Sequence, residues 1–402
     1  MGLGECLVGA AEARNVARVM RSQALFRYYG VGTRPSLGYV TRLERKIARL
    51  HGIKYTLGVS SGTAALEVGL GALGVGPGDE VILPVWSWVS CFTAIVRLGA
   101  RPVLAEVDDS LNLDPAEIDR LTTPATRGIL VVHYQGVAAD MAPILQRARR
   151  HQHWVLEDCA ESLGASYRGR LVGTMGNLAT YSFQQRKVIT SGEGGMIATA
   201  DGRLYERAVR MSDIGQYRDE HRAIKPGEVV SFAGSNYRMG ELAGAVACAQ
   251  VARVRPMIRH LRQLRAIMQR EVGKIPGLVW RHLPDPTGDL GFDSYFFLPT
   301  HAQAVALKER ARVRGVTLAP HTGTYCQFSR EYCQSGATHT PRFSPFAGLS
   351  PWPAPGYRER DFPRTSAYVG RMVSVPLGAL FTAADARHVG RVIREEVRPL
   401  LA

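Results

Sequence analysis

The sequence lacks the features that would place the protein in a membrane or outside the cell. No stretch approaches about eighteen uninterrupted apolar residues, so no membrane-spanning segment is expected. Residues 1–15 lack the basic region followed by an apolar block that marks a secretory signal. The six cysteines are scattered, without a C-x-x-C pair or zinc-like spacing, which fits reduced thiols better than disulfides. We therefore expect a cytoplasmic protein without a membrane anchor or a metal site.

Acidic residues are scarce relative to basic ones. The chain of 402 residues has 50 Lys and Arg against 35 Asp and Glu, a net charge of +15. The basic residues are spread over many segments, with local density at 253–270, and form no block with interleaved aromatics. Nucleic-acid binding is therefore not expected. A positive field also favours acidic small molecules such as phosphates and nucleotide sugars, and the charge alone does not choose between these partners.

Strand and helix patterns alternate over residues 1–255. Apolar residues at helical spacing predict a helix over 36–50. Continuous apolar runs at 128–134 and 154–158 are typical of strands buried on both faces of a parallel sheet. Further strands are predicted at 56–60, 80–84 and 101–107, and further helices at 10–22, 63–73 and 90–98. This alternation predicts a large α/β domain with a mainly parallel sheet over 1–255.

The pattern changes near Pro256. A long basic helix, a strand at 295–299, a helix at 302–314 and a last helix at 383–400 predict a smaller α+β domain over 256–402. The segment 321–357 is rich in Tyr, Pro and Ser and is long for a loop without secondary structure. We expect it to contact substrate or another subunit.

One loop stands out chemically. Residues 179–199, ATYSFQQRKVITSGEGGMIAT, predict a strand, a polar loop with Lys187, a glycine cluster and a second strand. A lysine that is desolvated in such a loop has a lowered pKa, and its amine can attack an aldehyde to form an imine. The alternative is a solvated surface lysine, because buried lysines are rare.

The segment SFQQRKVITSGEGG resembles the lysine loop of the DegT/DnrJ/EryC1/StrS family, the sugar and cyclitol aminotransferases that use pyridoxal phosphate (PLP). The resemblance covers most of residues 20–250 and implies the aspartate-aminotransferase-like fold (fold type I), with Lys187 holding PLP as an imine. It extends in order through SSGTAAL (60–66), LPVWSWVSCFTAI (83–95), EDCAESLGA (157–165) and SNYRMGELAGAV (235–246).

The segment SSGTAAL fits the phosphate of the cofactor. A helix N-terminus with free N–H groups binds anions, although helix capping alone explains the same residue types. The resemblance assigns Gly62, Thr63 and Ala64 to the phosphate, and Ser182 adds a hydroxyl. It also implies that Asn236 of the partner subunit reaches the phosphate, and a site shared in that way implies a homodimer.

The remaining cofactor contacts are also implied by the resemblance. Asp158 would keep the pyridine nitrogen protonated, the alternative being a helix cap. Glu161 stands where the family commonly has glutamine near the ring hydroxyl, which leaves its contact open. Trp88 stands where the family places an aromatic over the ring, and offset stacking suits that position. Alternation makes Trp86 the core tryptophan.

Three further residues are candidates for the substrate pocket. His133 and Tyr134 resemble the family's His-x-x-Gly stretch, and a structural histidine fits equally well. Tyr29 lies in LFRYYG (25–30), which is similar to members that act on cyclitols or keto-sugars. The glycines of Gly69-x-Gly71-x-x-Gly74 match a dinucleotide motif, but they lie inside the helix predicted at 63–73 and do not predict an oxidoreductase.

The resemblance implies a PLP-dependent aminotransferase that moves an amino group from glutamine or glutamate to a keto-sugar or keto-cyclitol. Amino-sugar or aminoglycoside antibiotic biosynthesis is the expected setting. The freed Lys187 amine would act as general base and acid at the donor's α-carbon. The alternatives are a keto-deoxysugar dehydratase, whose family members have histidine in place of Lys187, and a catalytically silent PLP-binding regulatory protein. The combination of Lys187, Asp158 and Trp88 argues against the catalytically silent alternative.

Overall fold

The structure is a computed structural model that describes residues 3–30, 32, 35–218, 221, 228–320, 325–340, 344–346 and 356–402. The α-helices are α1 (Ala10–Ser22), α2 (Tyr39–His51), α3 (Gly62–Ala72), α4 (Val89–Arg97), α5 (Ala116–Leu121), α6 (Met141–Arg150), α7 (Gly202–Ser212), α8 (Glu241–Gln250), α9 (Val254–Val272), α10 (His301–Val313), α11 (Glu331–Ser335), α12 (Pro363–Val369) and α13 (Ala383–Leu401). The strands are β1 (Tyr55–Val59), β2 (Glu80–Pro84), β3 (Arg101–Ala105), β4 (Thr126–Val132), β5 (Trp154–Asp158), β6 (Ser166–Tyr167), β7 (Arg170–Leu171), β8 (Leu178–Ser182), β9 (Gly195–Thr199), β10 (Val279–Trp280), β11 (Asp293–Phe297), β12 (Ala319–Pro320) and β13 (Met372–Pro376).

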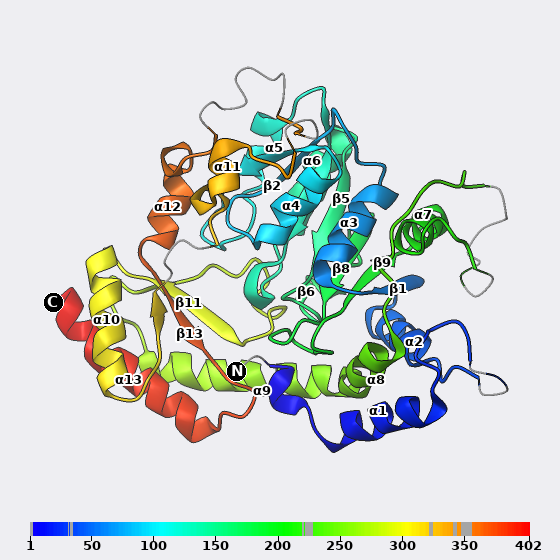
Figure 1. Cartoon of the computed structure of the whole chain (residues 1–402). Coiled ribbons are helices and arrows are strands. Elements are labelled where there is room, and N and C mark those ends of the chain that lie inside the picture. The colour runs from blue at the N-terminus through cyan, green and yellow to red at the C-terminus, as the bar shows by residue number, and fades with distance from the viewer. Residues whose placement is uncertain are drawn as a thin grey trace.

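Seven strands form the central sheet, in the order β1-β9-β8-β5-β4-β2-β3 (Figure 1). Strands β3, β2, β4, β5 and β8 pair in parallel, whereas β9 runs antiparallel to both β8 and β1. The predicted mainly parallel sheet is therefore confirmed. Because parallel strands end at the same edge of a sheet, the loops that follow β1, β2, β4, β5 and β8 meet there.

Alternate residues of the central strands enter two separate apolar clusters. In β4, Ile129 and Val131 pack in one cluster with residues of α2, α6, α8 and α9. Leu130 and Val132 pack in the other cluster with residues of α3, α4 and α7. Burial on both faces explains why this strand forms a continuous apolar run in the sequence.

Of the glycines in the dinucleotide-like motif, Gly69 packs α3 against the sheet as predicted, whereas Gly71 faces Met211 of α7. A Cβ atom on Gly69 would lie 2.8 Å from the side chain of Leu178 in β8. The motif begins inside α3 and runs past the end of that helix, and therefore does not form the turn between a strand and a helix that a dinucleotide site requires.

A second, antiparallel sheet has the order β10-β11-β13-β12. The long basic helix predicted near 253–270 is α9, and α13 packs along it at the lower left of Figure 1. The boundary predicted after residue 255 falls inside the first turn of α9, so the division into 1–255 and 256–402 stays a prediction. Part of the segment 321–357 lies outside the described residues. No helix of the described residues is long and apolar enough to cross a bilayer.

A buried carboxylate in β5 organises the loops beneath the sheet edge. The side chain of Glu157 is fully buried and is 3.0 Å from Nε2 of His133. Burial acts to raise the pKa of Glu157, but its hydrogen bond and electrostatic interaction with His133, together with backbone N–H groups, outweigh it and lower the pKa. The N–H groups that donate to this carboxylate, at 2.5–2.7 Å, belong to Gly173, Met175 and Gly176.

We expect Glu157→Gln to destabilise the fold by about 3–5 kcal/mol, because an amide NH₂ would replace an oxygen that accepts buried N–H groups. Urea denaturation measures this loss, and Glu193→Gln, at an exposed position of the lysine loop, is the control and should change stability by less than about 0.5 kcal/mol.

The stabilisation that Glu157 contributes depends on pH with a defined sign. Because the folded pKa of Glu157 is lowered, its contribution is present above the ordinary glutamate pKa of about 4.3 and is lost as the pH falls through the folded value. The difference between the two proteins should therefore shrink in acid. Equal urea midpoints at neutral pH would contradict the role of Glu157.

Candidate active site

The lysine loop is held at its backbone from both sides. The N–H of Lys187 donates to the carbonyl of Gln184 (2.9 Å), and its carbonyl accepts the N–H of Gly4 (2.9 Å). The N–H of Ser191 donates to the carbonyl of Phe183 (2.9 Å), which closes the loop at the end of β8. The position of Lys187 therefore depends on the N-terminal segment as well as on β8 and β9.

The amine of Lys187 forms an ion pair with Glu161. Its Nζ lies 3.2 Å from Oε1 of Glu161, and the two side chains are 19% and 14% exposed. Burial acts to lower the pKa of Lys187, but the charges of Glu161 and Asp158 outweigh it and raise the pKa. The lowered pKa expected from the sequence is therefore wrong for the chain by itself, because that expectation left out the carboxylate of Glu161.

Asp158 is buried at the end of β5, on the opposite strand face from Glu157. Its carboxylate accepts the thiol S–H of Cys91 in α4 (3.2 Å) and the N–H of Ala160 (3.0 Å). Burial raises the pKa of Asp158, while these two hydrogen bonds and the charge of Lys187 act to lower it. The carboxylate therefore lies in a place where a cationic partner would be favourable.

The N-terminus of α3 faces the end of β8. Ser61 caps the helix, since its Oγ accepts the N–H of Ala64 (3.0 Å), so this N–H is already occupied in the chain by itself. The first N–H groups of a helix, here those of Gly62 and Thr63, have no partner within the helix. A Cβ atom on Gly62 would lie 2.8 Å from Cβ of Ser182, so only glycine allows these two segments to approach.

The two tryptophans after β2 have different environments, as alternation predicts. Trp86 is fully buried, whereas Trp88 is 50% exposed at the N-terminus of α4. The ring centroid of Tyr325 lies 5.6 Å from that of Trp88, and the carbonyl of Tyr325 accepts the N–H of Ser87 (3.1 Å). Tyr325, from the long segment 321–357, thus packs beside the exposed indole.

Both ring nitrogens of His133 are used inside the core. Nδ1 accepts the N–H of Ala139 (3.1 Å), so Nε2 carries the proton that faces Glu157. This geometry favours the structural role for His133. Tyr134 is also buried, and its ring packs against Trp86 at a centroid distance of 5.5 Å. Neither side chain is open to solvent.

Tyr29 and Asn236 are exposed, and the described contacts place them in a cluster of their own. Asp213, which is fully buried, pairs with Arg218 and Arg238 and forms a backbone bridge with Asn236. The guanidinium of Arg218 lies 5.5 Å from the ring centroid of Tyr29. No contact between this cluster and Lys187 is recorded within the described part of the chain.

The second sheet contributes a carboxylate that the sequence did not single out. Asp293 begins β11, and Tyr295, two residues on, shares its strand face. The ring of Tyr295 lies 6.0 Å from that of Tyr134, which turns this face toward the sheet edge. Burial and the charge of Glu161 raise the pKa of Asp293 to about 7, while Arg281 acts to lower it. A single Asp before an aromatic strand gives no sequence signal that it lies near the site.

Comparisons with known proteins agree with this arrangement. The model of the DegT/DnrJ/EryC1/StrS aminotransferase family matches residues 10–394. The chain is 41% identical over 218 residues (54% of this chain, 57% of the relative) to GDP-perosamine synthase of Caulobacter vibrioides. It is 39% identical over 246 residues (58% and 57%) to L-glutamine:2-deoxy-scyllo-inosose aminotransferase of Streptomyces kanamyceticus. The matched stretch thus spans a little over half the length of each of these curated relatives.

The fold has close counterparts among solved structures. The crystal structure of 3-amino-5-hydroxybenzoic acid synthase is 28% identical in sequence, with a TM-score of 0.79. The match covers 98% of this chain and 97% of that chain. The α/β fold with a mainly parallel sheet, fold type I, is therefore confirmed over nearly the whole length.

We expect Glu161→Gln to lower the pKa of Lys187, because the amide removes the charge that opposes the effect of burial. Only the neutral amine forms an imine, so the rate at which the cofactor-free protein reacts with pyridoxal phosphate should reach its midpoint at a lower pH. Lys187→Ala gives the background rate, and Glu193→Gln in the same loop is the matched control. Identical pH profiles for Glu161→Gln and wild type would contradict the role of the ion pair.

We expect Asp293→Asn to make stability less sensitive to pH between about 4 and 7. The folded pKa of Asp293 is raised to about 7, so its stabilising contribution is complete below the ordinary aspartate value of about 3.9 and is lost as the pH rises through 7. Melting temperatures of the cofactor-free proteins measure this, and Asp109→Asn, at an exposed position, serves as control. A parallel fall of wild type and Asp293→Asn with pH would contradict the assignment.

Proposed function

The chain belongs to the DegT/DnrJ/EryC1/StrS aminotransferase family, and we propose that it is a PLP-dependent aminotransferase that acts on a keto-sugar or keto-cyclitol. The observation that carries the proposal is the pairing of the Lys187 amine with Glu161, within electrostatic reach of the buried Asp158 carboxylate. Both carboxylates follow or end β5, at the edge where the parallel strands finish.

The residues at this edge fit pyridoxal phosphate. Lys187 would bind it covalently, Asp158 would face its ring nitrogen, and Trp88 would cover its ring. Gly62 and Ser182 would hold its phosphate, and the close approach that only glycine permits at Gly62 supports this. The raised pKa of Asp158 fits a site that receives a cationic nitrogen. When bound, the cofactor supplies an electron sink for negative charge at the substrate carbon.

The chain itself supplies the proton transfers. Nζ of Lys187 is the group that would take a proton from the α-carbon of the amino donor in the first half-reaction, and it would supply a proton to the carbon of the acceptor that receives the amino group in the second. To act as a base the amine has to be neutral, and Glu161, at 3.2 Å, is the group that accepts its hydrogen bond and sets its protonation. The exposed face of Trp88 and the ring of Tyr325 would limit the access of water.

Glutamine or glutamate is the proposed amino donor, and the proposed setting is amino-sugar or aminoglycoside biosynthesis in the cytoplasm. The names of the two relatives support this range, since one makes GDP-perosamine and the other uses L-glutamine on 2-deoxy-scyllo-inosose. We propose a homodimer in which Asn236 of the partner subunit completes the phosphate site. The presence of Lys187 argues against the dehydratase alternative.

The visible absorption spectrum tests the proposed function. With PLP bound, we expect a band near about 410–430 nm that bleaches toward about 330 nm when L-glutamine or L-glutamate is added. Lys187→Ala should lose the band, and the amino acid that bleaches it identifies the donor. A protein that binds no PLP would overturn the proposal. One that binds PLP but bleaches with neither amino acid would favour the dehydratase or regulatory alternatives.

A further inference from the structure

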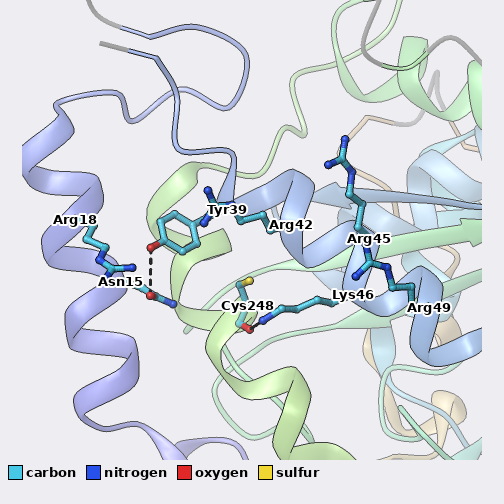
Figure 2. A pocket seen from close by; sticks show the side chains of 8 residues that line it. All are labelled: Asn15, Arg18, Tyr39, Arg42, Arg45, Lys46, Arg49 and Cys248. Carbon is cyan, nitrogen blue, oxygen red and sulfur yellow. Dashed lines mark hydrogen bonds between the residues drawn. The ribbon is translucent and has the colours of Figure 1, made fainter.

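A hollow of about 350 Å³ lies between α1, α2 and α8 and shares none of its lining residues with the Lys187 site (Figure 2). Five cations line it, and no lining residue is acidic. These cations are Arg18 from α1 and Arg42, Arg45, Lys46 and Arg49 from α2. The hollow therefore gathers part of the basic surplus that the proposed aminotransferase chemistry does not use.

The four cations of α2 follow helical spacing and lie on one helix face. Like charges three and four residues apart repel and destabilise a helix, so such a face is costly unless an anion covers it. The acidic residue of α2, Glu44, points to the other side and pairs with Arg27 (2.8 Å). Within the described part of the chain, no ion pair is recorded for any of the five cations.

The nearby acid at the start of α2 is already engaged. Glu241 of α8 accepts the N–H groups of Tyr39 (2.7 Å) and Val40 (3.0 Å). Burial raises the pKa of this carboxylate, while the two N–H groups and the charges of Arg27 and Arg42 act to lower it, so Glu241 also interacts with one of the five cations.

The floor of the hollow is fixed by hydrogen bonds. The hydroxyl of Tyr39 donates to Oδ1 of Asn15 (3.2 Å), and Nδ2 of Asn15 donates to the carbonyl of Ala245 in α8 (3.1 Å). Lys46 donates to the carbonyl of Cys248 (2.9 Å). The guanidinium of Arg42 lies 5.2 Å from the ring centroid of Tyr39. These hydrogen bonds join the three helices at the base of the hollow.

We propose that this hollow binds a multiply charged phosphate anion of about the size of a nucleoside diphosphate. Guanidinium groups bind phosphate through two parallel N–H donors, and here two helices contribute them to the lining of one hollow. The volume lies in the range of small-molecule sites, about 300–1,000 Å³. A free nucleotide and a nucleotide-linked sugar share the pyrophosphate that this site would recognise.

Titration calorimetry on the PLP-loaded protein at constant ionic strength tests the site. Inorganic pyrophosphate, UDP and UDP-glucose are the probes. We expect all three to bind, and the double variant Arg45→Gln/Arg49→Gln to bind at least about tenfold more weakly, because hydrogen bonds to charged groups are lost. The matched control is Arg259→Gln/Arg270→Gln, which removes two exposed cations at a mid-helix and a last-turn position of α9 and should leave the affinity unchanged.

The outcomes separate the possible sources of anion binding. Tighter binding of UDP-glucose than of UDP supports a nucleotide-linked sugar, and equal binding supports the nucleotide alone. Absence of pyrophosphate binding overturns the proposal, as does equal weakening in both double variants, which would indicate diffuse charge. A changed oligomeric state of Arg45→Gln/Arg49→Gln, measured by light scattering, would show that a second copy covers the hollow and would also overturn it.

A third variant keeps the test decisive if the first double variant does not fold. Glutamine is a good helix former, so both double variants should fold, and circular dichroism checks this. If Arg45→Gln/Arg49→Gln does not fold, Arg18→Gln on α1 tests the same hollow from its opposite wall. Binding is measured calorimetrically, so the result does not depend on whether the protein transfers amino groups.

Discussion

The site depends on two adjacent carboxylates that point to opposite faces of one buried strand. In β5, Glu157 faces the cluster beneath the sheet, where three N–H groups and His133 satisfy it. Asp158 faces α4, where the thiol of Cys91 and one N–H contact its carboxylate. Successive side chains of a strand point to opposite faces. Glu157 can therefore stabilise the fold through its hydrogen bonds while Asp158, on the other face, can contact a ligand.

The sheet edge is rich in acidic side chains, whereas the chain as a whole has a net positive charge. The net charge is +15, yet Glu161, Asp158 and Asp293 are coupled to one another or to the Lys187 amine. Burial raises the pKa of both aspartates, because the interior disfavours their charged forms. A cationic ring nitrogen beside Asp158 would favour the charged form of that carboxylate. The basic surplus lies elsewhere, including the exposed face of α2.

The sequence predicts those parts of the site that local pattern determines. The buried strand that ends in Asp158, the glycine at the start of α3 and the contrast between Trp86 and Trp88 all follow from periodicity and resemblance. The pKa of Lys187 does not follow from local pattern. It depends on the hydrogen bond between the amine and Glu161, which lies 26 residues away in the sequence. Asp293 is more remote still, since only the packing of a second sheet brings it to the edge.

Two residues that resemblance assigns to the site, Tyr29 and Asn236, belong to one unit. Asp213 connects them, because it bridges to Asn236 and pairs with Arg218, whose guanidinium lies over the ring of Tyr29. If Asn236 of the partner subunit reaches the phosphate, the same rigid unit carries Tyr29 toward the same active site. The buried Asp213 then has a functional reason, since its carboxylate positions Arg218 beside Tyr29 while its backbone pairs with that of Asn236.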